Sequence, residues 1–289
     1  MPAIILDGRK IRDEAIPELA KSFANLGFIP VLTIIQVGDK EDTNAYIRAK
    51  KLFAEKLGVK VKHLQLPENI SQSEIIDIIY KENNDTDVKG IIVQLPLPIS
   101  MDRKVVIDII DPKKDVDAIT SHNVKFWTEG DRQALLPATA RGVRSLLKYY
   151  NIDLSGKKVV VIGRSDLVGK PIACMCSNEK AIVTVCHSKT FDLAKETLNA
   201  DIIISVVGKV NLITKDHVKP GQIVIDVGIN TIEDKKLDEN NGGVYKRKIV
   251  GDVDFEQVSK IVQATSPVPG GVGPLTVLSV FQNLLDLTG

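Results

Sequence analysis

The stretch KKVVVIGRSDLVGKP, Lys157 to Pro171, decides the fold of the second half of this chain. It begins with a run of valine and isoleucine, which is typical of a strand buried on both faces of a parallel sheet. The run ends at Gly163, where a glycine allows a tight backbone turn, and a helix is expected from about Val168. Because the N-terminus of such a helix offers unpaired N–H groups to an anion, the stretch predicts a nucleotide-binding turn.

The glycine spacing of this turn differs from the usual G-x-G-x-x-G pattern of dinucleotide-binding domains. Ser165 stands at the second glycine, and the next glycine, Gly169, comes one residue late. The turn is therefore a weak signal by itself. Leu167 also occupies the final glycine position of a G-x-S-x-G nucleophile elbow, so Ser165 is a poor candidate for a nucleophile.

Strand and helix signals alternate on both sides of this stretch. Before it, an irregular polar stretch follows Asp117, and Thr139 is expected to cap the helix ARGVRSLLKYY. After it, helical signals from Thr190 stand among three further strands, AIVTVCH, ADIIISVVG and GQIVIDVG. This alternation predicts a doubly wound, Rossmann-type α/β domain over residues 139–266.

The first half of the chain carries an α/β pattern of its own. Strands are expected at Pro30–Gly38, Val59–Leu66 and Val88–Pro98. A helix is expected over Asn44–Leu57, where the following glycine would end it, and a second helix begins at the capping box of Ser71 and Glu74. These signals predict an α/β substrate domain over residues 1–138, to which a C-terminal helix within residues 267–289 is expected to return.

Length and composition fit a protein of two domains without a strong electrostatic bias. The 289 residues exceed the size of one typical core, and a net charge of +1 gives no electrostatic case for nucleic acid or an anionic membrane. No apolar run approaches the roughly 20 residues that span a bilayer, and the charges in MPAIILDGRKIRDEAI argue against a signal peptide. The few cysteines form no disulfide framework, and no metal site is expected because Cys174-x-Cys176 lacks a second ligand pair. We therefore expect a cytoplasmic protein with reduced thiols.

The end of the strand AIVTVCH, which follows the helix expected from Val168, distinguishes between two nicotinamide cofactors. NAD-binding domains usually place Asp or Glu there to bind the ribose 2′-hydroxyl, but this chain reads Cys186-His187-Ser188-Lys189-Thr190, without an acid. Arg164 in the first turn, together with Ser188 and Lys189, would suit the 2′-phosphate of NADP. NADP is therefore favoured over NAD. For the individual residues an alternative stays open, in which a capped helix begins near Ser188 and His187 is merely structural.

Polar residues of the first domain stand at strand and turn ends, where α/β proteins bind ligands. Tyr46 and Lys50 are four residues apart on the expected helix and share a face, although a solvated lysine is the ordinary interpretation of such a pair alone. Gln94 ends a buried strand, where an unbonded amide is costly. Asp115 and Asp117 stand on either side of a valine, and this alternation is expected to turn one carboxylate inward.

These segments resemble the bifunctional methylenetetrahydrofolate dehydrogenase–methenyltetrahydrofolate cyclohydrolase family over nearly the whole chain. A rigid loop, SPVPGGVGPLT (Ser266–Thr276), is among the most specific of them. The similarity rests on motifs in the family's order: YIRAKK, GIIVQLPLP, DPKKDVDA, GRSDLVGKP, VCHSKT, VIDVGIN, GDVDF and PVPGGVGPLT.

The resemblance implies two reactions in one cleft between the domains. NADP would oxidise 5,10-methylenetetrahydrofolate to the 5,10-methenyl form, which water would open to 10-formyltetrahydrofolate. Lys50 would be the catalytic amine, held and tuned by Gln94. Tyr46 would stack on the folate ring system, and Asp117 would accept hydrogen bonds from the pterin. The family also implies a homodimer.

The resemblance further implies two sets of binding residues. The folate set comprises Tyr46, Asp117, Leu95, Pro96, Gly271, Val272 and Pro274. The cofactor set comprises Gly163, Arg164, Ser165, Val168, Gly169, His187, Ser188, Gly208 and Ile229. The chain departs from the family pattern mainly at Ala118-Ile119-Thr120, where the family has glycine, an aromatic residue and histidine. It also departs at Thr43, Ala138 and Leu275, but no departure removes a proposed catalytic group.

Two alternatives remain open at this point. A two-domain NADP dehydrogenase similar to shikimate dehydrogenases would also place a lysine and an aspartate at its substrate. It would lack the strand-end glutamine and the proline–glycine loop, however. A non-catalytic NADP-binding regulator would have no need of Lys50, Gln94 and Asp117. The sequence contains no P-loop, so a formate-ligating activity is not expected.

Overall fold

The computed structural model describes residues 2–131, 133–238 and 244–289. They form two compact units. The three-stranded unit comprises Arg12–Arg141 and Thr276–Gly289, and the six-stranded unit comprises Met1–Ile11 and Gly142–Leu275. Compared with the predicted domains, residues 1–11 and 267–275 group with the six-stranded unit instead of the first domain.

Backbone contacts within the six-stranded unit explain this difference. β1 (Ile4–Ile5) pairs in parallel with β11 (Ala264–Thr265), and the N–H of Gly8 donates to the carbonyl oxygen of Gly270 at 2.9 Å. Gly8 lies so close to Gly271 that an added Cβ would stand 1.9 Å from its carbonyl oxygen. A strand of two residues has no periodicity, so the sequence carries no local signal for it.

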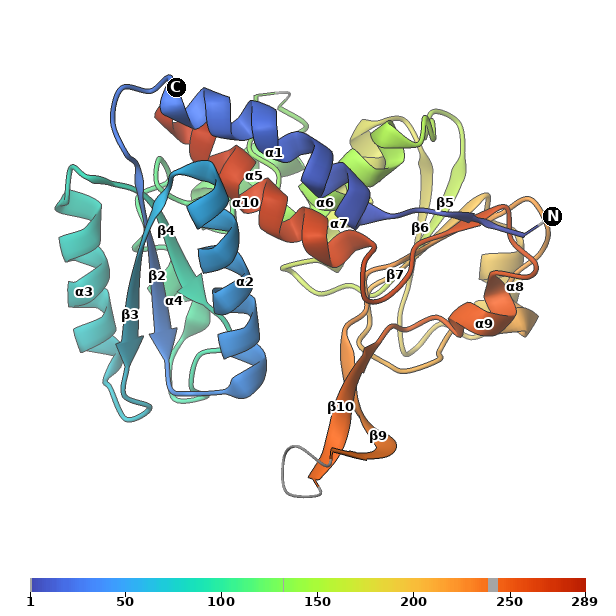
Figure 1. Cartoon of the computed structure of the whole chain (residues 1–289). Helices are drawn as coiled ribbons and strands as arrows, with labels where there is room; N and C mark the ends of the chain where they lie inside the picture. Colours follow the sequence, from blue (N-terminus) through green and yellow to red (C-terminus); the bar gives the residue numbers. More distant parts are fainter. Residues whose placement is uncertain (1, 132, 239–243) are drawn as a thin grey trace. The chain divides into compact units, whose positions relative to one another are not determined.

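The three-stranded unit is a parallel sheet between two helices (Figure 1). The strands in sheet order, followed by the helices, are β3 (Lys60–Leu66), β2 (Val31–Val37), β4 (Val88–Gln94), α2 (Glu41–Leu57) and α3 (Gln72–Asn84). α3 packs Ile75 into a core with Ile35 of β2. Because side chains alternate along a strand, the neighbouring Gln36 points to the other face, where it bonds Asn44 of α2 at 2.8 Å.

The predicted start of α3 and the predicted end of α2 are confirmed. The Ser71 hydroxyl accepts a hydrogen bond from the N–H of Glu74 at 3.3 Å, and the Glu74 carboxylate accepts one from the N–H of Ser71 at 2.8 Å. This reciprocal pair is the capping box that starts α3. Gly58 ends α2 in the left-handed conformation, with φ 71°. α2 begins at Glu41, one turn earlier than expected.

Further helices are α1 (Gly8–Ala24), α4 (Arg103–Ile107), α5 (Ser121–Thr128) and α6 (Ala138–Tyr149).

The C-terminal helix, α10 (Val272–Thr288), returns to the three-stranded unit, as predicted. On α10, the ring of Phe281 lies 5.4 Å from that of Phe53. Asn283 donates a hydrogen bond to the carbonyl oxygen of Val116 at 2.7 Å. Figure 1 shows α10 running beside α1.

Three local predictions were wrong. Thr139 does not cap α6, because the helix already begins at Ala138. The helix expected from Thr190 begins at Leu193, where Asp192 caps it by accepting the N–H of Lys195. The polar stretch after Asp117 is not irregular throughout, since Thr120 accepts the N–H of Asn123 and starts α5.

The six-stranded sheet confirms the predicted doubly wound fold. Its strands are all parallel, in the order β1, β11, β8 (Ile223–Asp226), β7 (Ile202–Ser205), β5 (Lys158–Ile162) and β6 (Ile182–Cys186). β5 and β7 are neighbours, and the chain proceeds from β5 outward to β6 but from β7 outward to β8. This reversal is the topological switch point, where such sheets bind ligands at the carboxyl ends of their strands.

Shorter elements complete the six-stranded unit. They are α7 (Gly169–Asn178), α8 (Leu193–Leu198), a 3₁₀ turn (Lys215–His217), α9 (Phe255–Val258) and an antiparallel hairpin of β9 (Asn230–Asp238) and β10 (Val244–Val250). The hairpin was not predicted. Val160, Ile162, Ile203 and Val224 from three central strands share one buried core.

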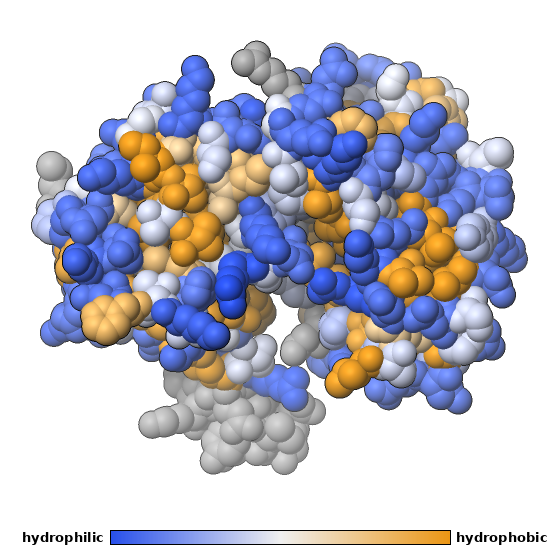
Figure 2. All heavy atoms as spheres, turned by 180° about the vertical axis from the view of Figure 1, so that it is seen from behind, coloured by the Kyte–Doolittle hydropathy of each residue, from blue (hydrophilic) through white to orange (hydrophobic). Residues whose placement is uncertain are grey.

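The surface is mixed in character. Figure 2 shows a face on which hydrophilic residues predominate and apolar residues lie in separate patches. Ile99 and Phe191 are among the most exposed apolar side chains. In the part of the chain that the structure describes, no helix is both long and apolar enough to cross a membrane.

Candidate active site

Lys50 and Gln94 meet at one end of the three-stranded sheet. Lys50 is only 7% exposed, and its Nζ donates a hydrogen bond to Oε1 of Gln94, the last residue of β4, at 2.9 Å. Burial disfavours the ammonium form and lowers the pKa of Lys50, although the negative charge of Asp117 opposes this shift. A lysine of this kind exchanges protons nearer to neutral pH than a solvated one.

Asp117 is the carboxylate whose charge acts on Lys50. It is half-buried, and burial raises its pKa, while the positive charge of Lys50 lowers it and the Asp115 carboxylate raises it. The protein thus disfavours the charged form of each group, and each charge partly compensates the other. Opposed shifts of this kind are typical of functional sites.

Asp115 has a different environment from Asp117. Its side chain is fully buried, and its Oδ2 accepts hydrogen bonds from the N–H of Thr120 at 2.8 Å and from Nδ2 of Asn123 at 2.9 Å. These contacts fold the turn that leads into α5. The deeper of the two alternating carboxylates therefore has a structural role, whereas Asp117 is the one beside the amine.

Tyr46 lies one helical turn before Lys50 on α2 and is half-buried. Residues four apart share a helix face, so the aromatic ring and the amine can line one site. The ordinary interpretation of Lys50 as a solvated surface lysine is wrong, because the residue is buried.

A chain of hydrogen bonds beside Lys50 is not apparent from the sequence. It runs from Lys51 Nζ to His63 Nδ1 (2.9 Å), from His63 Nε2 to Gln36 Oε1 (2.9 Å), from Gln36 Nε2 to Asn44 Oδ1 (2.8 Å) and from Asn44 Nδ2 to Asp39 Oδ1 (2.7 Å). Gln36 is directly opposite Gln94 in the sheet, so this series of hydrogen bonds fastens α2 over the strand end that holds Lys50. The sequence signal is a glutamine at the same register in each strand, Gln36, Gln65 and Gln94.

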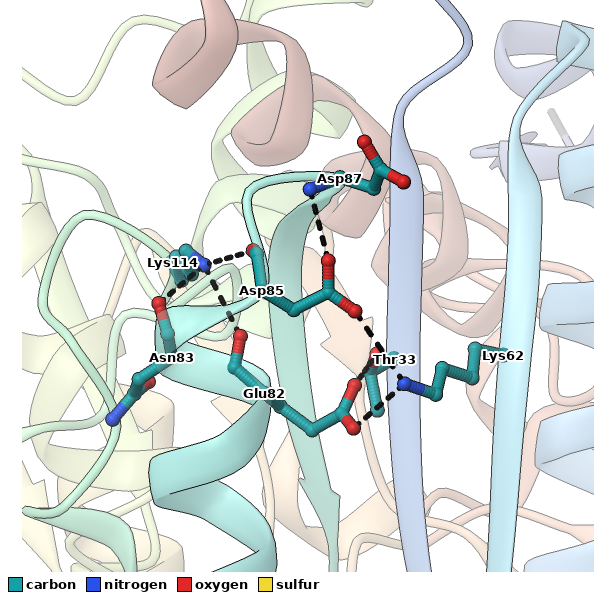
Figure 3. Close-up of polar contacts among 7 residues, drawn as sticks. All are labelled: Thr33, Lys62, Glu82, Asn83, Asp85, Asp87 and Lys114. Carbon is teal, nitrogen blue, oxygen red and sulfur yellow. Dashed lines mark hydrogen bonds and ion pairs between the residues drawn. The ribbon is translucent and has the colours of Figure 1, made fainter.

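A second network anchors the segment that carries Asp117 (Figure 3). Lys114 Nζ donates to the carbonyl oxygens of Glu82, Asn83 and Asp85, at 3.1, 2.6 and 2.8 Å, at the end of α3. The buried carboxylate of Glu82 accepts hydrogen bonds from Thr33 at 2.8 Å and from Lys62 at 2.7 Å. The ammonium of Lys114 thus satisfies carbonyl oxygens at the C-terminus of α3 and ties the segment that carries Asp117 to this helix.

Ala118 explains the main departure from the family pattern. Its φ is +55°, in the left-handed region where glycine is favoured, and its side chain is fully buried. Its carbonyl oxygen accepts a hydrogen bond from the indole N–H of Trp127 at 3.3 Å. The backbone therefore keeps a conformation suited to the family's glycine, and the small methyl group of alanine is accommodated.

The remaining residues of the predicted folate set lie in two segments. Leu95 and Pro96 follow Gln94 directly and are joined by a cis peptide bond. Gly271, Val272 and Pro274 lie in the proline–glycine loop and the first turn of α10. The backbone of this loop turns tightly, since the N–H of Gly271 donates to the carbonyl oxygen of Pro267 at 2.8 Å.

The turn after β5 shows what Gly169, the glycine that comes one residue late, does. Gly163 has φ +121°, and a Cβ added at Gly169 would lie 2.4 Å from the Gly163 carbonyl oxygen. Gly169 therefore allows α7 to start tightly against the strand. Ser165 Oγ accepts the N–H of Gly169 at 3.2 Å, and Arg164 on this turn is exposed. Val168 precedes the first residue of the helix.

Residues 187–190, directly after β6, include no acid, and Ser188 and Lys189 are exposed. His187 Nδ1 accepts the N–H of Lys189 at 3.1 Å, and the N–H of His187 donates to Thr190 Oγ1 at 2.9 Å. No helix begins near Ser188, so that part of the alternative is wrong, although the His187 ring does hold the turn. An exposed amine and hydroxyl without a carboxylate suit a phosphate group.

The last two cofactor-set residues follow β7 and β8. Gly208 has φ +74° in the loop after β7, and Ile229, after β8, is 45% exposed. Within the described ranges, no group of three or more His, Cys, Asp or Glu side chains is placed to hold a metal ion.

Comparisons with known proteins place the chain in a family. Residues 6–117 match the catalytic domain, and residues 137–288 the NAD(P)-binding domain, of tetrahydrofolate dehydrogenase/cyclohydrolase. The bifunctional protein FolD of Lactobacillus acidophilus is 43% identical over 98% of this chain and 96% of its own length.

Two solved structures are similar over almost the full length. The bifunctional FolD methylenetetrahydrofolate dehydrogenase/cyclohydrolase of Campylobacter jejuni has a TM-score of 0.92 and 41% identity, covering 99% of this chain and 98% of that one. The Trypanosoma brucei enzyme, in complex with NADP cofactor and inhibitor, has a TM-score of 0.93 and 34% identity, covering 100% and 98%. These matches decide against the shikimate-dehydrogenase alternative, and the chain belongs to the bifunctional tetrahydrofolate dehydrogenase/cyclohydrolase family.

Proposed function

We propose that this chain oxidises 5,10-methylenetetrahydrofolate with NADP and hydrolyses the 5,10-methenyl product to 10-formyltetrahydrofolate. The observation that carries this proposal is the buried Lys50, bonded to Gln94 at 2.9 Å, in a chain of this family. Burial lowers the pKa of Lys50, which suits the amine to move a proton of a reacting water molecule.

In the hydrolysis, water adds to the methenyl carbon and loses one proton, which the neutral amine of Lys50 accepts. Gln94 Oε1 holds that amine in place. The carbon–N5 bond of the intermediate then breaks as its hydroxyl becomes the formyl carbonyl, and the hydroxyl proton passes to N5. One proton is released overall, by way of Lys50.

Substrate binding uses the other residues around the amine. Asp117 accepts hydrogen bonds from the amino and ring N–H groups of the pterin, and these donors favour its charged form. Tyr46 stacks on the folate ring system from the same helix face as Lys50. Leu95 and Pro96, which follow Gln94, contact the folate as well, and the family resemblance also assigns Gly271, Val272 and Pro274 to folate binding.

NADP, when bound, supplies the hydride acceptor for the oxidation. Gly163, Ser165, Val168 and Gly169 present the start of α7 to the pyrophosphate. Arg164 and Ser188 are both exposed, residues 187–190 include no acid, and the two side chains bind the 2′-phosphate. This donor set favours NADP over NAD.

A direct assay tests the proposal. The purified chain is mixed with methylenetetrahydrofolate and either NADP or NAD, and the reduced cofactor is followed by absorbance. Methenyltetrahydrofolate is supplied separately, and its loss is compared with the uncatalysed rate. We expect reduction of NADP in preference to NAD, together with accelerated hydrolysis. If neither reaction is faster than its background rate, the proposed function is wrong.

We also propose that the chain acts as a homodimer in the cytoplasm. The family supports the dimer, and the three cysteines, which form no disulfide with one another, fit a reducing compartment. Light scattering tests the first point, because a monomer would have a mass of 31.6 kDa.

A further inference from the structure

A buried carboxylate organises the loop that follows β7. Asp252 is fully buried, and its two oxygens accept hydrogen bonds from Ser205 Oγ (3.0 Å), Val207 N (2.7 Å), Gly208 N (3.3 Å), Lys209 N (2.8 Å) and Asn230 Nδ2 (3.1 Å). Three successive backbone N–H groups therefore point at one carboxylate. Hydrogen bonds to a charged acceptor are the stronger kind, so the conformation of this loop depends on Asp252.

The loop lies at the switch point of the six-stranded sheet. The N–H of Val206 donates to the carbonyl oxygen of Ile162 at 2.9 Å, and a Cβ added at Gly163 would lie 2.7 Å from the carbonyl oxygen of Val206. The loop thus lies directly against the glycine turn after β5. Asn230 brings the segment after β8 to the same carboxylate.

Asp252 is itself held by a second buried carboxylate. Asp226, at the end of β8, accepts the N–H groups of Gly228 at 2.9 Å, Asp252 at 3.0 Å and Val253 at 2.9 Å. A Cβ added at Gly228 would lie 2.1 Å from Asp252 Oδ1, and one at Gly251 would lie 1.8 Å from Asp226 Oδ2. The backbone is closed around both carboxylates, so Asp252 has little freedom to move.

The strand order indicates which part of the cofactor this loop serves. In the order β8, β7, β5, β6, the turn after β5 suits the pyrophosphate and the turn after β6 suits the adenosine ribose. A dinucleotide that continues past the pyrophosphate then lies over the ends of β7 and β8. Because Asp252 is fully buried, it reaches the cofactor only through the loop.

We propose that Asp252 is a positioning residue for the nicotinamide half of NADP, acting through residues 207–209 and Asn230. This inference rests on the proposed use of NADP. Replacing Asp252 by asparagine keeps the size of the side chain but turns an N–H group toward the N–H groups of the loop. The loop then loses its conformation, whereas Lys50 and Gln94, which belong to the three-stranded unit, keep theirs.

The test compares Asp252→Asn with the parent in a fluorescence titration of NADPH, an assay of methenyltetrahydrofolate hydrolysis and thermal melting. We expect NADPH affinity to fall about tenfold or more, as for the loss of one charge-assisted hydrogen bond, with hydrolysis within about twofold of the parent. Asp254→Asn is the matched control, since this half-buried aspartate caps α9 and bonds the N–H and the side-chain amide of Gln257, both outside the loop after β7. It should leave NADPH affinity unchanged.

Ser205→Ala serves as a milder second variant, because it removes a single hydroxyl donor from Asp252. We expect a several-fold loss of NADPH affinity without loss of hydrolysis. Unchanged NADPH affinity in the folded variants overturns the inference. It is also overturned if NADPH affinity and hydrolysis fall equally while the melting temperature falls, because that pattern shows general unfolding. A parent that binds no NADPH would instead refute the proposed cofactor.

Discussion

Lys50→Met is the sharpest test of the proposed hydrolysis. Methionine keeps the length of the side chain but cannot take up or release a proton. A general acid–base group typically contributes about 10²- to 10⁴-fold to a rate, or roughly 3–5 kcal/mol of the barrier. Hydrolysis of methenyltetrahydrofolate should fall by at least the smaller of these factors.

The fold should survive this change. Gln94 Oε1 loses the donor that lies 2.9 Å away, which costs about 1–3 kcal/mol for an unsatisfied polar group. The variant also no longer buries an ammonium group, the burial of which lowers the pKa of Lys50, so part of this cost is offset. NADPH affinity should stay within about twofold of the parent.

The assay follows the loss of methenyltetrahydrofolate by absorbance across a range of pH. Because the neutral amine accepts the proton, the parent rate should rise with pH through the lowered pKa of Lys50, and the variant should lack that rise. Lys51→Met is the matched control, since Lys51 bonds His63 at 2.9 Å and is replaced in the same way. A Lys50→Met protein that hydrolyses within about twofold of the parent would refute the role.

Four further outcomes are expected. Arg164→Ala should raise the Michaelis constant for NADP about 10- to 100-fold, by the 1.5–3 kcal/mol of a charged hydrogen bond, and that for NAD far less; equal effects would place the side chain on the pyrophosphate. Asp117→Asn should cost roughly 2–4 kcal/mol of folate affinity in a fluorescence titration, whereas Asp115→Asn should mainly lower the melting temperature, because its carboxylate is buried and bonded within the fold; the reverse pattern would identify the wrong carboxylate. Ala118→Gly should change the free energy of unfolding by less than about 1 kcal/mol in urea, since relief of the left-handed strain roughly equals the lost burial and the entropy of glycine; a larger loss would show that the methyl group is needed. Burial raises the pKa of Asp226 to about 7, so the folded protein retains a proton that the unfolded chain has lost. The stability from this group should therefore be lost as pH rises through about 7, and Asp226→Asn should remove that slope in urea titrations; an unchanged slope would exclude the group.

Residues that act on their neighbours in the chain could be read from the sequence alone. The Ser71–Glu74 capping box and the terminating Gly58 were predicted because their hydrogen bonds close within one helical turn. The longer strands of both sheets were predicted, most clearly the central ones such as β2 and β5, because a buried parallel strand must be apolar almost throughout. The order of the motifs was sufficient to indicate the family.

Tertiary structure decided what depends on residues far apart in the chain. Lys50 and Gln94 are 44 positions apart, and only the packing of α2 on the sheet removes the amine from water and lowers its pKa. Spacing alone could not tell that Asp115 is buried while the charge of Asp117 acts on the amine, because both alternate equally with Val116. The two-residue strand Ile4–Ile5 exists only through its pairing with β11. The five donors of Asp252 likewise come from distant parts of the chain. Burial and long-range hydrogen bonding, unlike caps and periodicity, leave no local pattern in a sequence.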